Sequence, residues 1–300
     1  MNSGEYLRWV RRVEYLCLSE VLSIVSTIKF VDTILQDLAA NLKMTLLDAY
    51  NSTVLRNDKQ GLAVLTINRP EKLNSLNVEV FEALDAHLAE LERQTDTVGL
   101  VLLRGAGNCF SAGHDLGDLA KGEQLPRAHF QSQVIERLAN LPQPVICAVH
   151  GHCYTGGLEL ALAGDVILAS ANAKFADTHA KWALTPLWGM SQRQPRRVGQ
   201  SHAMEMMLSC RTVGAQEALS LGLVNRCFAD EDFFDAVDTY AQQVLAHSWF
   251  SHRANKKLLV QTDGLPLGAG LAHEVYRHEG VGPDVHARIA SFLQKKSSKS

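Results

Sequence analysis

Two short segments rich in small residues combine features that suit the binding of a carbonyl group. The first runs from Asn108 to Gly117 and reads NCFSAGHDLG, and the second runs from His150 to Ala161 and reads HGHCYTGGLELA. Each follows an apolar run with the length of a strand. Glycines such as Gly113 and Gly156 let a ligand approach the backbone closely. These two segments are therefore the candidate site.

A helix that begins near Gly156 would leave its first backbone N–H groups unpaired, at the positive end of the helix dipole. Such donors suit a developing oxyanion, and a second N–H from a neighbouring turn would complete an oxyanion hole. Glu159, in the first turn of the same helix, could act as a general base or acid. A structural interpretation stays open, because glycine is common after strands and glutamate is frequent at helix N-termini.

Other catalytic motifs are missing from the sequence. It contains no P-loop and no G-x-S-x-G elbow, and Phe110 stands where a dinucleotide fingerprint beginning at Gly105 needs a glycine. His273 and His278 are one residue further apart than the zinc-protease helix allows. His150 and His152 have no third ligand nearby, so a core or surface position is favoured over a metal site.

The elements that must position the candidate site follow from apolar periodicity. Strands are predicted at residues 62–67, 98–103, 144–149 and 166–169, and helices at 78–91, 157–163, 203–208, 215–221, 233–246 and 250–260. Strands that alternate with helices indicate an α/β fold with buried strands. The last third of the chain is expected to be helical.

Composition narrows the functional classes. The 300 residues are 46% hydrophobic and 20% charged, with a net charge of −3, which excludes wholesale disorder and gives no electrostatic reason to expect a nucleic acid. No apolar run is long enough for a membrane span. The six cysteines form no C-x-x-C pair, which favours free thiols in a reducing compartment.

Residues 1–43 differ from the rest of the chain. Apolar residues between Val21 and Leu35 recur at helical spacing and predict an amphipathic helix. Three arginines, at positions 8, 11 and 12, suggest a mitochondrial transit segment, but the acidic residues among them argue against it. A partner-binding helix and an over-extended start before Met44 are the alternatives. A cytoplasmic location is the default, with a mitochondrial one as the alternative.

Four ordered motifs resemble the crotonase (enoyl-CoA hydratase/isomerase) superfamily, over about residues 54–260. They are NRPEKLNSL at 68–76, FSAGHD at 110–115, GHCYTGGLELA at 151–161 and Gly164-Asp165, followed by AQEALSLGLV at 215–224. The resemblance implies an α/β, crotonase-like spiral of ββα units with a C-terminal helical trimerisation region. The corresponding domains are an extension at 1–43, a core at 44–246 and a helical region at 247–300.

The resemblance also implies a substrate, an acyl-CoA thioester whose carbonyl is held by the backbone N–H groups of His114 and Gly156. Glu159 matches one of the two catalytic glutamates of the hydratases. Substrate and CoA contacts are implied for Lys72, Ala112, Asp115, Leu116 and Lys257, and Lys256, like Lys257, is implied to reach the CoA phosphates. No metal or redox cofactor is implied, since coenzyme A enters as part of the substrate. The expected assembly is a homotrimer, or a hexamer made as a dimer of trimers.

The family pattern breaks at its second glutamate, where this sequence has His179. Histidine titrates near neutrality and could share the acid–base work, with Asp177 as a possible substitute. A local hydrogen bond is the structural alternative for His179. The His114 side chain is expected as a pocket wall, and Trp182 and Trp188 in or beside the acyl pocket or in the core.

The predicted function is therefore that of an enoyl-CoA hydratase, which adds water to a 2-enoyl-CoA through a thioester enolate. Alternatives on the same scaffold are a double-bond isomerase, which needs only one base, a thioester hydrolase and a decarboxylase. A non-catalytic CoA-binding scaffold is the alternative from another class. RNA binding is disfavoured by the near-neutral charge.

Overall fold

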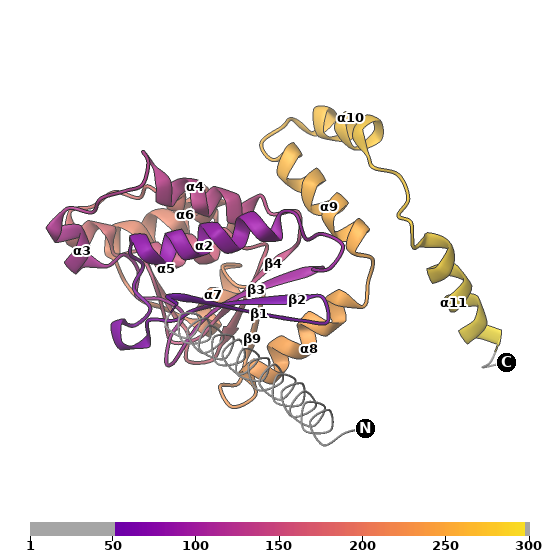
Figure 1. Ribbon diagram of the computed structural model, residues 1–300. Helices are drawn as coiled ribbons and strands as arrows, with labels where there is room; N and C mark the ends of the chain where they lie inside the picture. Colours follow the sequence, from indigo (N-terminus) through magenta and orange to yellow (C-terminus); the bar gives the residue numbers. More distant parts are fainter. Residues whose placement is uncertain (1–51, 298–300) are drawn as a thin grey trace, which may run out of the picture. The chain divides into compact units, whose positions relative to one another are not determined.

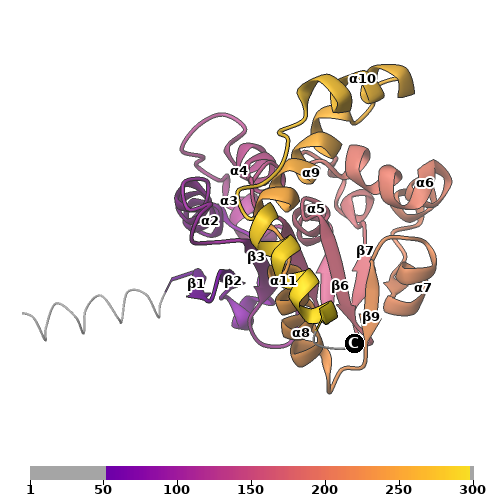
Figure 2. The same ribbon diagram turned by 90° about the vertical axis from the view of Figure 1, so that its right-hand side faces the viewer.

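The computed structural model describes residues 52–297, and Figures 1 and 2 show its ribbon in two views. The helix predicted within residues 1–43 and the proposed domain boundary at residue 43 lie outside the described residues. The second proposed boundary, at residue 246, stays a prediction.

A six-stranded sheet runs through the core in the order β1-β2-β3-β4-β6-β9. Its strands are β1 (Val54–Lys59), β2 (Leu62–Ile67), β3 (Leu100–Gly105), β4 (Val145–Val149), β6 (Val166–Ser170) and β9 (Arg226–Phe228). The β1–β2 pair is antiparallel and the other pairs are parallel. All five residues of β4 are buried, as expected for a parallel strand that is covered on both faces.

A second sheet has the order β5-β7-β8, with β5 at His152–Tyr154, β7 at Lys174–Ala176 and β8 at Val213–Gly214. β4 leads into β5 and β6 leads into β7, so the chain alternates between the two sheets. The turn from β4 to β5 requires Gly151, because its φ is 55° and a side chain there would clash with the backbone of Asn108. This alternation is the predicted spiral of ββα units.

Helices cover both faces of the six-stranded sheet (Figure 1). They are α2 (Val78–Leu91), α3 (Leu116–Lys121), α4 (Phe130–Ala139), α5 (Gly156–Leu162), α6 (Met190–Ser209), α7 (Ala215–Ser220), α8 (Phe233–Leu245), α9 (Trp249–Thr262), α10 (Leu267–Arg277) and α11 (Val285–Ser297), with short 3-10 helices η1 (Pro70–Lys72) and η2 (His179–Trp182). α2, α4 and α5 share one hydrophobic cluster with the sheet, whereas α8 packs with the other face. The predicted α/β core with a helical last third is confirmed.

The helix predicted at 203–208 proved to be the end of a longer element. α6 begins at Met190, contains Pro195 and is broken at Gly199, where φ is 77° and ψ is 159°. Its first half lacks a regular apolar stripe, and proline usually argues against a helix interior. These two features explain why the sequence pattern revealed only the last turns.

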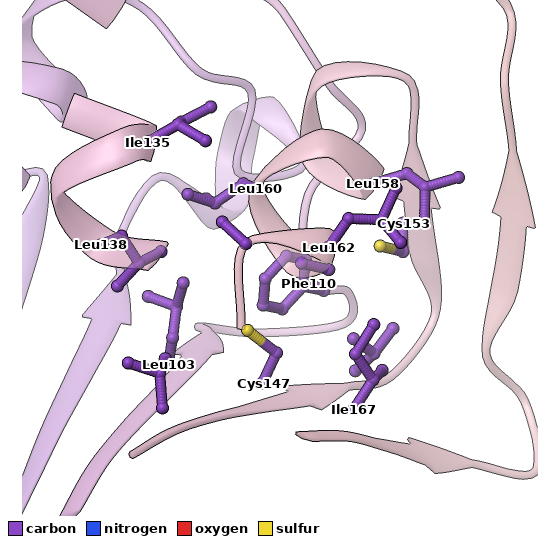
Figure 3. Close-up of a cluster of buried hydrophobic side chains, with 14 of the residues drawn as sticks. Leu103, Phe110, Ile135, Leu138, Cys147, Cys153, Leu158, Leu160, Leu162 and Ile167 are labelled. Atoms are coloured by element: carbon purple, nitrogen blue, oxygen red, sulfur yellow. The ribbon is translucent and has the colours of Figure 1, made fainter. Parts of the chain in front are cut away.

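α5 lies deep in the larger core cluster. All seven of its residues are buried. Figure 3 shows Leu158, Leu160 and Leu162 of this helix among Phe110, Cys147 and other apolar side chains of the surrounding elements. The core therefore fixes the helix that carries the candidate base.

Candidate active site

The chain makes a sharp turn immediately before α5. Thr155 has φ 47° and ψ −109°, a conformation that is costly for a residue with a branched side chain. Its hydroxyl is 2.5 Å from that of Thr178 and accepts a hydrogen bond from the Thr178 N–H at 3.1 Å. These bonds, together with burial, hold the turn from which α5 begins.

The N–H groups of His114 and Gly156 lie close together. A Cβ on Gly156 would be 3.2 Å from the His114 nitrogen, and a Cβ on Gly113 would be 3.4 Å from the Gly156 nitrogen. Among residues 52–297 neither N–H has a hydrogen-bond acceptor. Two free donors this close form the geometry of an oxyanion hole.

The loop that carries His114 is held rigidly on both sides. Leu76 donates its N–H to the Gly113 carbonyl at 2.8 Å and accepts from the Asp115 N–H at 2.9 Å. The Ser111 hydroxyl donates to the Asn74 carbonyl at 2.8 Å and accepts from the Gly113 N–H at 3.1 Å. This leaves the His114 N–H as the group that the loop presents.

Glu159 is 2% exposed and its two carboxylate oxygens have different surroundings. Oε1 accepts hydrogen bonds from the backbone N–H groups of Trp188 at 2.9 Å and Met190 at 3.1 Å. Oε2 lies 3.6 Å from His179 Nε2. One oxygen therefore anchors the side chain, and the other is available for proton transfer.

His179 is oriented by Asp177, which is also buried. Asp177 Oδ1 is 2.7 Å from His179 Nδ1 and accepts from the His179 backbone N–H at 3.0 Å. Burial lowers the pKa of His179, but hydrogen bonds to Asp177 and Glu159 and the charges of these two carboxylates outweigh it and raise the pKa to about 9. At neutral pH the imidazole is thus protonated, between two carboxylates.

The predicted groups line one cavity of about 100 Å³. Its lining residues are His114, Leu119, Gln131, Thr155, Gly156, Glu159, His179, Leu184, Thr185, Leu187 and Trp188. The His114 side chain is a wall of this cavity, as expected, and its ring centroid is 4.9 Å from that of Trp188.

Trp182 does not meet the expectation that placed it at the acyl pocket or in the core. Trp182 is 55% exposed and does not line the cavity. The reason is local, since η2 ends at Trp182 and Ala183 turns the chain with φ 54°.

The residues implied as substrate contacts occupy several places. Ala112 is half-buried on the loop before His114, and Leu116 is exposed at the start of α3. Asp115 caps α3 by accepting from the Gly117 and Asp118 N–H groups. Its carboxylate also accepts from Arg69 at 3.1 Å, so its position is set by protein contacts.

The implied basic residues lie outside the cavity. Lys72 is exposed at the end of η1. Lys257 Nζ is 2.5 Å from Glu279 and lines a separate hollow of about 420 Å³ beside α9. Lys256 instead ties α9 to the core, through Asp165 at 2.8 Å and the Gln143 carbonyl at 3.1 Å.

Sequence reasoning missed the donors that hold Glu159. Trp188 and Met190 contribute backbone N–H groups, and every residue except proline has such a group. The residue types therefore give no sign that these two positions bind Glu159. The Asp-x-His spacing at 177–179 was a usable signal, because aspartate commonly accepts from the backbone N–H two residues on.

His150 and His152, considered as a metal pair, have separate surroundings. The His150 ring packs 5.3 Å from Phe234, and its Nε2 is 2.9 Å from the Gly107 carbonyl, whereas His152 packs against Tyr154. No group of three or more potential metal-binding side chains occurs in residues 52–297. Within the same range, no helix is long and apolar enough to cross a membrane.

Several known proteins with similar sequences have names that identify a CoA thioester as their substrate. The 1,2-epoxyphenylacetyl-CoA isomerase of Escherichia coli (strain K12) is 33% identical over 253 residues, which cover 81% of this chain and 96% of the relative. The 2,3-dehydroadipyl-CoA hydratase of the same organism is 33% identical over 251 residues, 82% of this chain and 97% of the relative. The short-chain-enoyl-CoA hydratase of Clostridium acetobutylicum is 29% identical over 228 residues, 75% of this chain and 87% of the relative.

Solved structures agree with the fold. The enoyl-CoA hydratase from Bacillus anthracis superposes with a TM-score of 0.76 at 28% identity, covering 81% of this chain and 96% of that one. The enoyl-CoA hydratase from Mycobacterium tuberculosis H37Rv gives a TM-score of 0.75 at 26% identity, covering 82% and 97%.

The sequence model of the enoyl-CoA hydratase/isomerase family matches residues 57–297, nearly the whole described structure. This match confirms the resemblance that the four motifs predict, and with the named relatives it supports a hydratase-like enzyme, with isomerisation as the alternative. The chain belongs to the enoyl-CoA hydratase/isomerase family.

Proposed function

We propose that this enzyme adds water to a short-chain 2-enoyl-CoA, with Glu159 and His179 as its acid–base pair. The observation that carries the proposal is the buried Asp177–His179–Glu159 arrangement beside two free N–H donors. The cavity of about 100 Å³ favours a short acyl chain, because a cavity of roughly 150 Å³ holds one benzene molecule.

The N–H groups of His114 and Gly156 would hold the thioester oxygen. Negative charge develops on this oxygen when the hydroxyl group of water bonds to the β-carbon. Fixed donors stabilise that charge more strongly in the transition state than in the ground state.

The two side chains would then divide the proton transfers. Glu159 is the base, since its Oε2 is not engaged by backbone donors, and it takes a proton from the attacking water. His179 is the acid, since it is protonated at neutral pH, and it gives its Nε2 proton to the α-carbon. Direct transfer from Glu159 to His179, whose facing atoms are 3.6 Å apart, restores both groups after product leaves. The net change is the addition of one water molecule.

A double-bond isomerase is the second candidate, because Glu159 is the one carboxylate among the residues that line the cavity. A single base can move a proton between two carbons of the acyl chain.

The test compares the wild type with Glu159→Gln on crotonyl-CoA and on 3-butenoyl-CoA. Hydration lowers the enoyl-thioester absorbance of crotonyl-CoA, whereas isomerisation of 3-butenoyl-CoA raises it. We expect the first signal in the wild type and a loss of about 10²- to 10⁴-fold in Glu159→Gln. The glutamine carbonyl can still accept from Trp188 and Met190, so the variant should fold and bind butyryl-CoA.

Other outcomes would redirect the proposal. Full activity in Glu159→Gln would remove this residue from the mechanism. Release of free CoA or of carbon dioxide from suitable thioesters would favour the hydrolase or the decarboxylase. Tight CoA-ester binding without turnover would favour the scaffold.

We infer no separate cofactor, since coenzyme A arrives with the substrate. Lys72 and Lys257 are proposed to contact its phosphate groups, because both lie on the surface and carry a positive charge. Lys257 would first have to leave Glu279.

Self-association as a homotrimer or a dimer of trimers is proposed from the exposed apolar side chains of the last three helices. These include Leu259, Leu267, Leu271, Val275, Tyr276, Ile289 and Phe292. Large exposed apolar surfaces commonly mark interfaces. A reducing, cytoplasmic location is proposed, with a mitochondrial one as the alternative, because the cysteines in the described residues are free.

A further inference from the structure

A second polar cluster borders the cavity from the α3–α4 side. His114, Leu119 and Gln131 line the cavity there. Behind them is Glu123, which follows α3 and has a side chain only 8% exposed. Gln131 Nε2 donates to Glu123 Oε2 at 3.0 Å. This carboxylate has no part in the acid–base chemistry proposed above.

Two buried atoms of this cluster lack hydrogen-bond partners. His114 Nε2 is 2.9 Å from Glu123 Oε2, but the contact lacks the alignment of a hydrogen bond. Glu123 Oε1 has no partner at all within residues 52–297. Unsatisfied buried polar atoms are uncommon in folded proteins and call for a specific reason.

The chemistry of these atoms points to one kind of ligand group. A carboxylate oxygen only accepts hydrogen bonds, and an imidazole N–H group only donates them. A hydroxyl group does both, so it can donate to Glu123 and accept from His114. Apolar side chains, including Leu119 and Trp188, complete the surroundings.

We propose that Glu123, His114 and Gln131 form a polar subsite that binds a hydroxyl group on the acyl chain of the substrate. This inference rests on the proposed function, because it places an acyl chain in the cavity. It narrows the substrate class to short acyl-CoA thioesters that carry a hydroxyl group beyond the reacting carbons. The same carboxylate would repel an acyl chain that ends in a carboxylate.

The test measures binding of saturated thioesters, which cannot be hydrated. Calorimetry compares 4-hydroxybutyryl-CoA with pentanoyl-CoA, in which a methyl group replaces the hydroxyl. We expect the wild type to bind the hydroxylated ester at least about tenfold more tightly, since the analogue leaves buried polar groups unpaired.

Two variants and a control sharpen this test. Glu123→Met removes the acceptor at similar length and should bring the affinity ratio close to one. Glu123→Gln keeps an acceptor oxygen and should give an intermediate ratio. Glu82→Gln, on the exposed side of α2, makes the same chemical change away from the cavity and should keep the wild-type ratio. Because each protein is judged by a ratio, a general loss of affinity does not mimic the effect.

Equal binding of the two esters by the wild type would overturn the subsite, and so would an unchanged ratio in Glu123→Met. If Glu123→Met does not fold, the wild-type ratio and Glu123→Gln decide. Hydroxyl preference without any turnover of crotonyl-CoA would refute the proposed hydration and leave the subsite standing. Turnover of crotonyl-CoA without a preference for the hydroxylated ester would support the hydration and refute the subsite.

Discussion

α5 and α10 are both rich in apolar residues, yet the two helices differ completely in how much of them is buried. All seven residues of α5 are buried, whereas none of the eleven residues of α10 is buried. Leu160 is fully covered in α5, whereas Leu267 of α10 is 79% exposed. The difference cannot come from helix propensity, because α5 begins with two glycines, which are poor helix formers.

The comparison teaches that α5 is held by packing within its own chain, whereas the apolar side chains of α10 are exposed in the single chain. Short helices are marginal on their own and depend on tertiary contacts. The Gly156 N–H and Glu159 therefore lie on a helix whose residues are all buried, whereas the His114 N–H belongs to the loop before α3. The last three helices are the region where a second copy could add contacts.

The largest contrast is expected from matched leucine truncations. Leu160→Ala opens a core cavity and should lower the free energy of unfolding by about 2–5 kcal/mol. Leu271→Ala, at a residue that is 53% exposed, should cost less than about 0.5 kcal/mol in a dissociated protomer. Urea unfolding at low protein concentration measures both.

The same pair also reports on assembly. Sedimentation should show that Leu271→Ala weakens self-association, whereas folded Leu160→Ala should associate normally. If Leu160→Ala and Leu271→Ala lowered the free energy of unfolding equally in dissociated protomers, the contrast between a buried α5 and an exposed α10 would be wrong.

The next effect comes from the charges buried beside α5. The folded pKa of His179 is about 9, above its ordinary value of 6.5. This raised pKa stabilises the fold fully below pH 6.5, and the contribution is lost as pH rises through 9. We expect a loss on the order of 2 kcal/mol across this window.

Thermal unfolding between pH 6 and pH 10 measures this loss, and His179→Gln should flatten the curve within that window. If His179 is the acid, as proposed, hydration should fall over the same alkaline range, because the imidazole loses its proton. A wild-type stability that does not change between pH 6.5 and pH 9 would contradict the buried charge network.

The last contrast comes from adding one methyl group to each helix. A Cβ on Gly157 would lie 2.7 Å from the Ser111 carbonyl oxygen, so Gly157→Ala should cost about 1–3 kcal/mol and displace the oxyanion loop. A Cβ on Gly270 of α10 meets nothing closer than 3.9 Å. Gly270→Ala should therefore stabilise the helix by up to about 1 kcal/mol. Thermal unfolding and crotonyl-CoA turnover are measured for both variants. A lower stability of Gly270→Ala would show that another surface already packs against α10 at this position.

Sequence patterns predicted the parts of the fold whose signal is local. β4 and β6 are continuous apolar runs, and both appear within a residue of their expected limits. The three-residue strands β5 and β7 were not predicted, because such short strands have no measurable period. Their existence depends on pairing with each other, which is a long-range effect.

The candidate site divides in the same way. Gly156, Glu159 and His114 were found because small residues and a carboxylate follow strands, and the family motif supplied their roles. The hold on Glu159 was not predictable, since Trp188 lies 29 residues further along the chain and contributes only a backbone N–H. Glu123 was missed because its loop has no motif, and only the fold brings it to His114.

The backbone bonds from Trp188 and Met190 to Glu159 have an evolutionary consequence. The segment that holds the carboxylate also supplies Trp188 as a cavity wall. A mutation that moves this segment outward to admit a longer acyl chain would also withdraw the two N–H donors from Glu159, the proposed base. Selection for a larger substrate would thus meet a penalty in rate. Divergence of this lineage toward other substrates is easier at Leu119 and Gln131, which line the cavity but neither hold Glu159 nor supply an oxyanion donor.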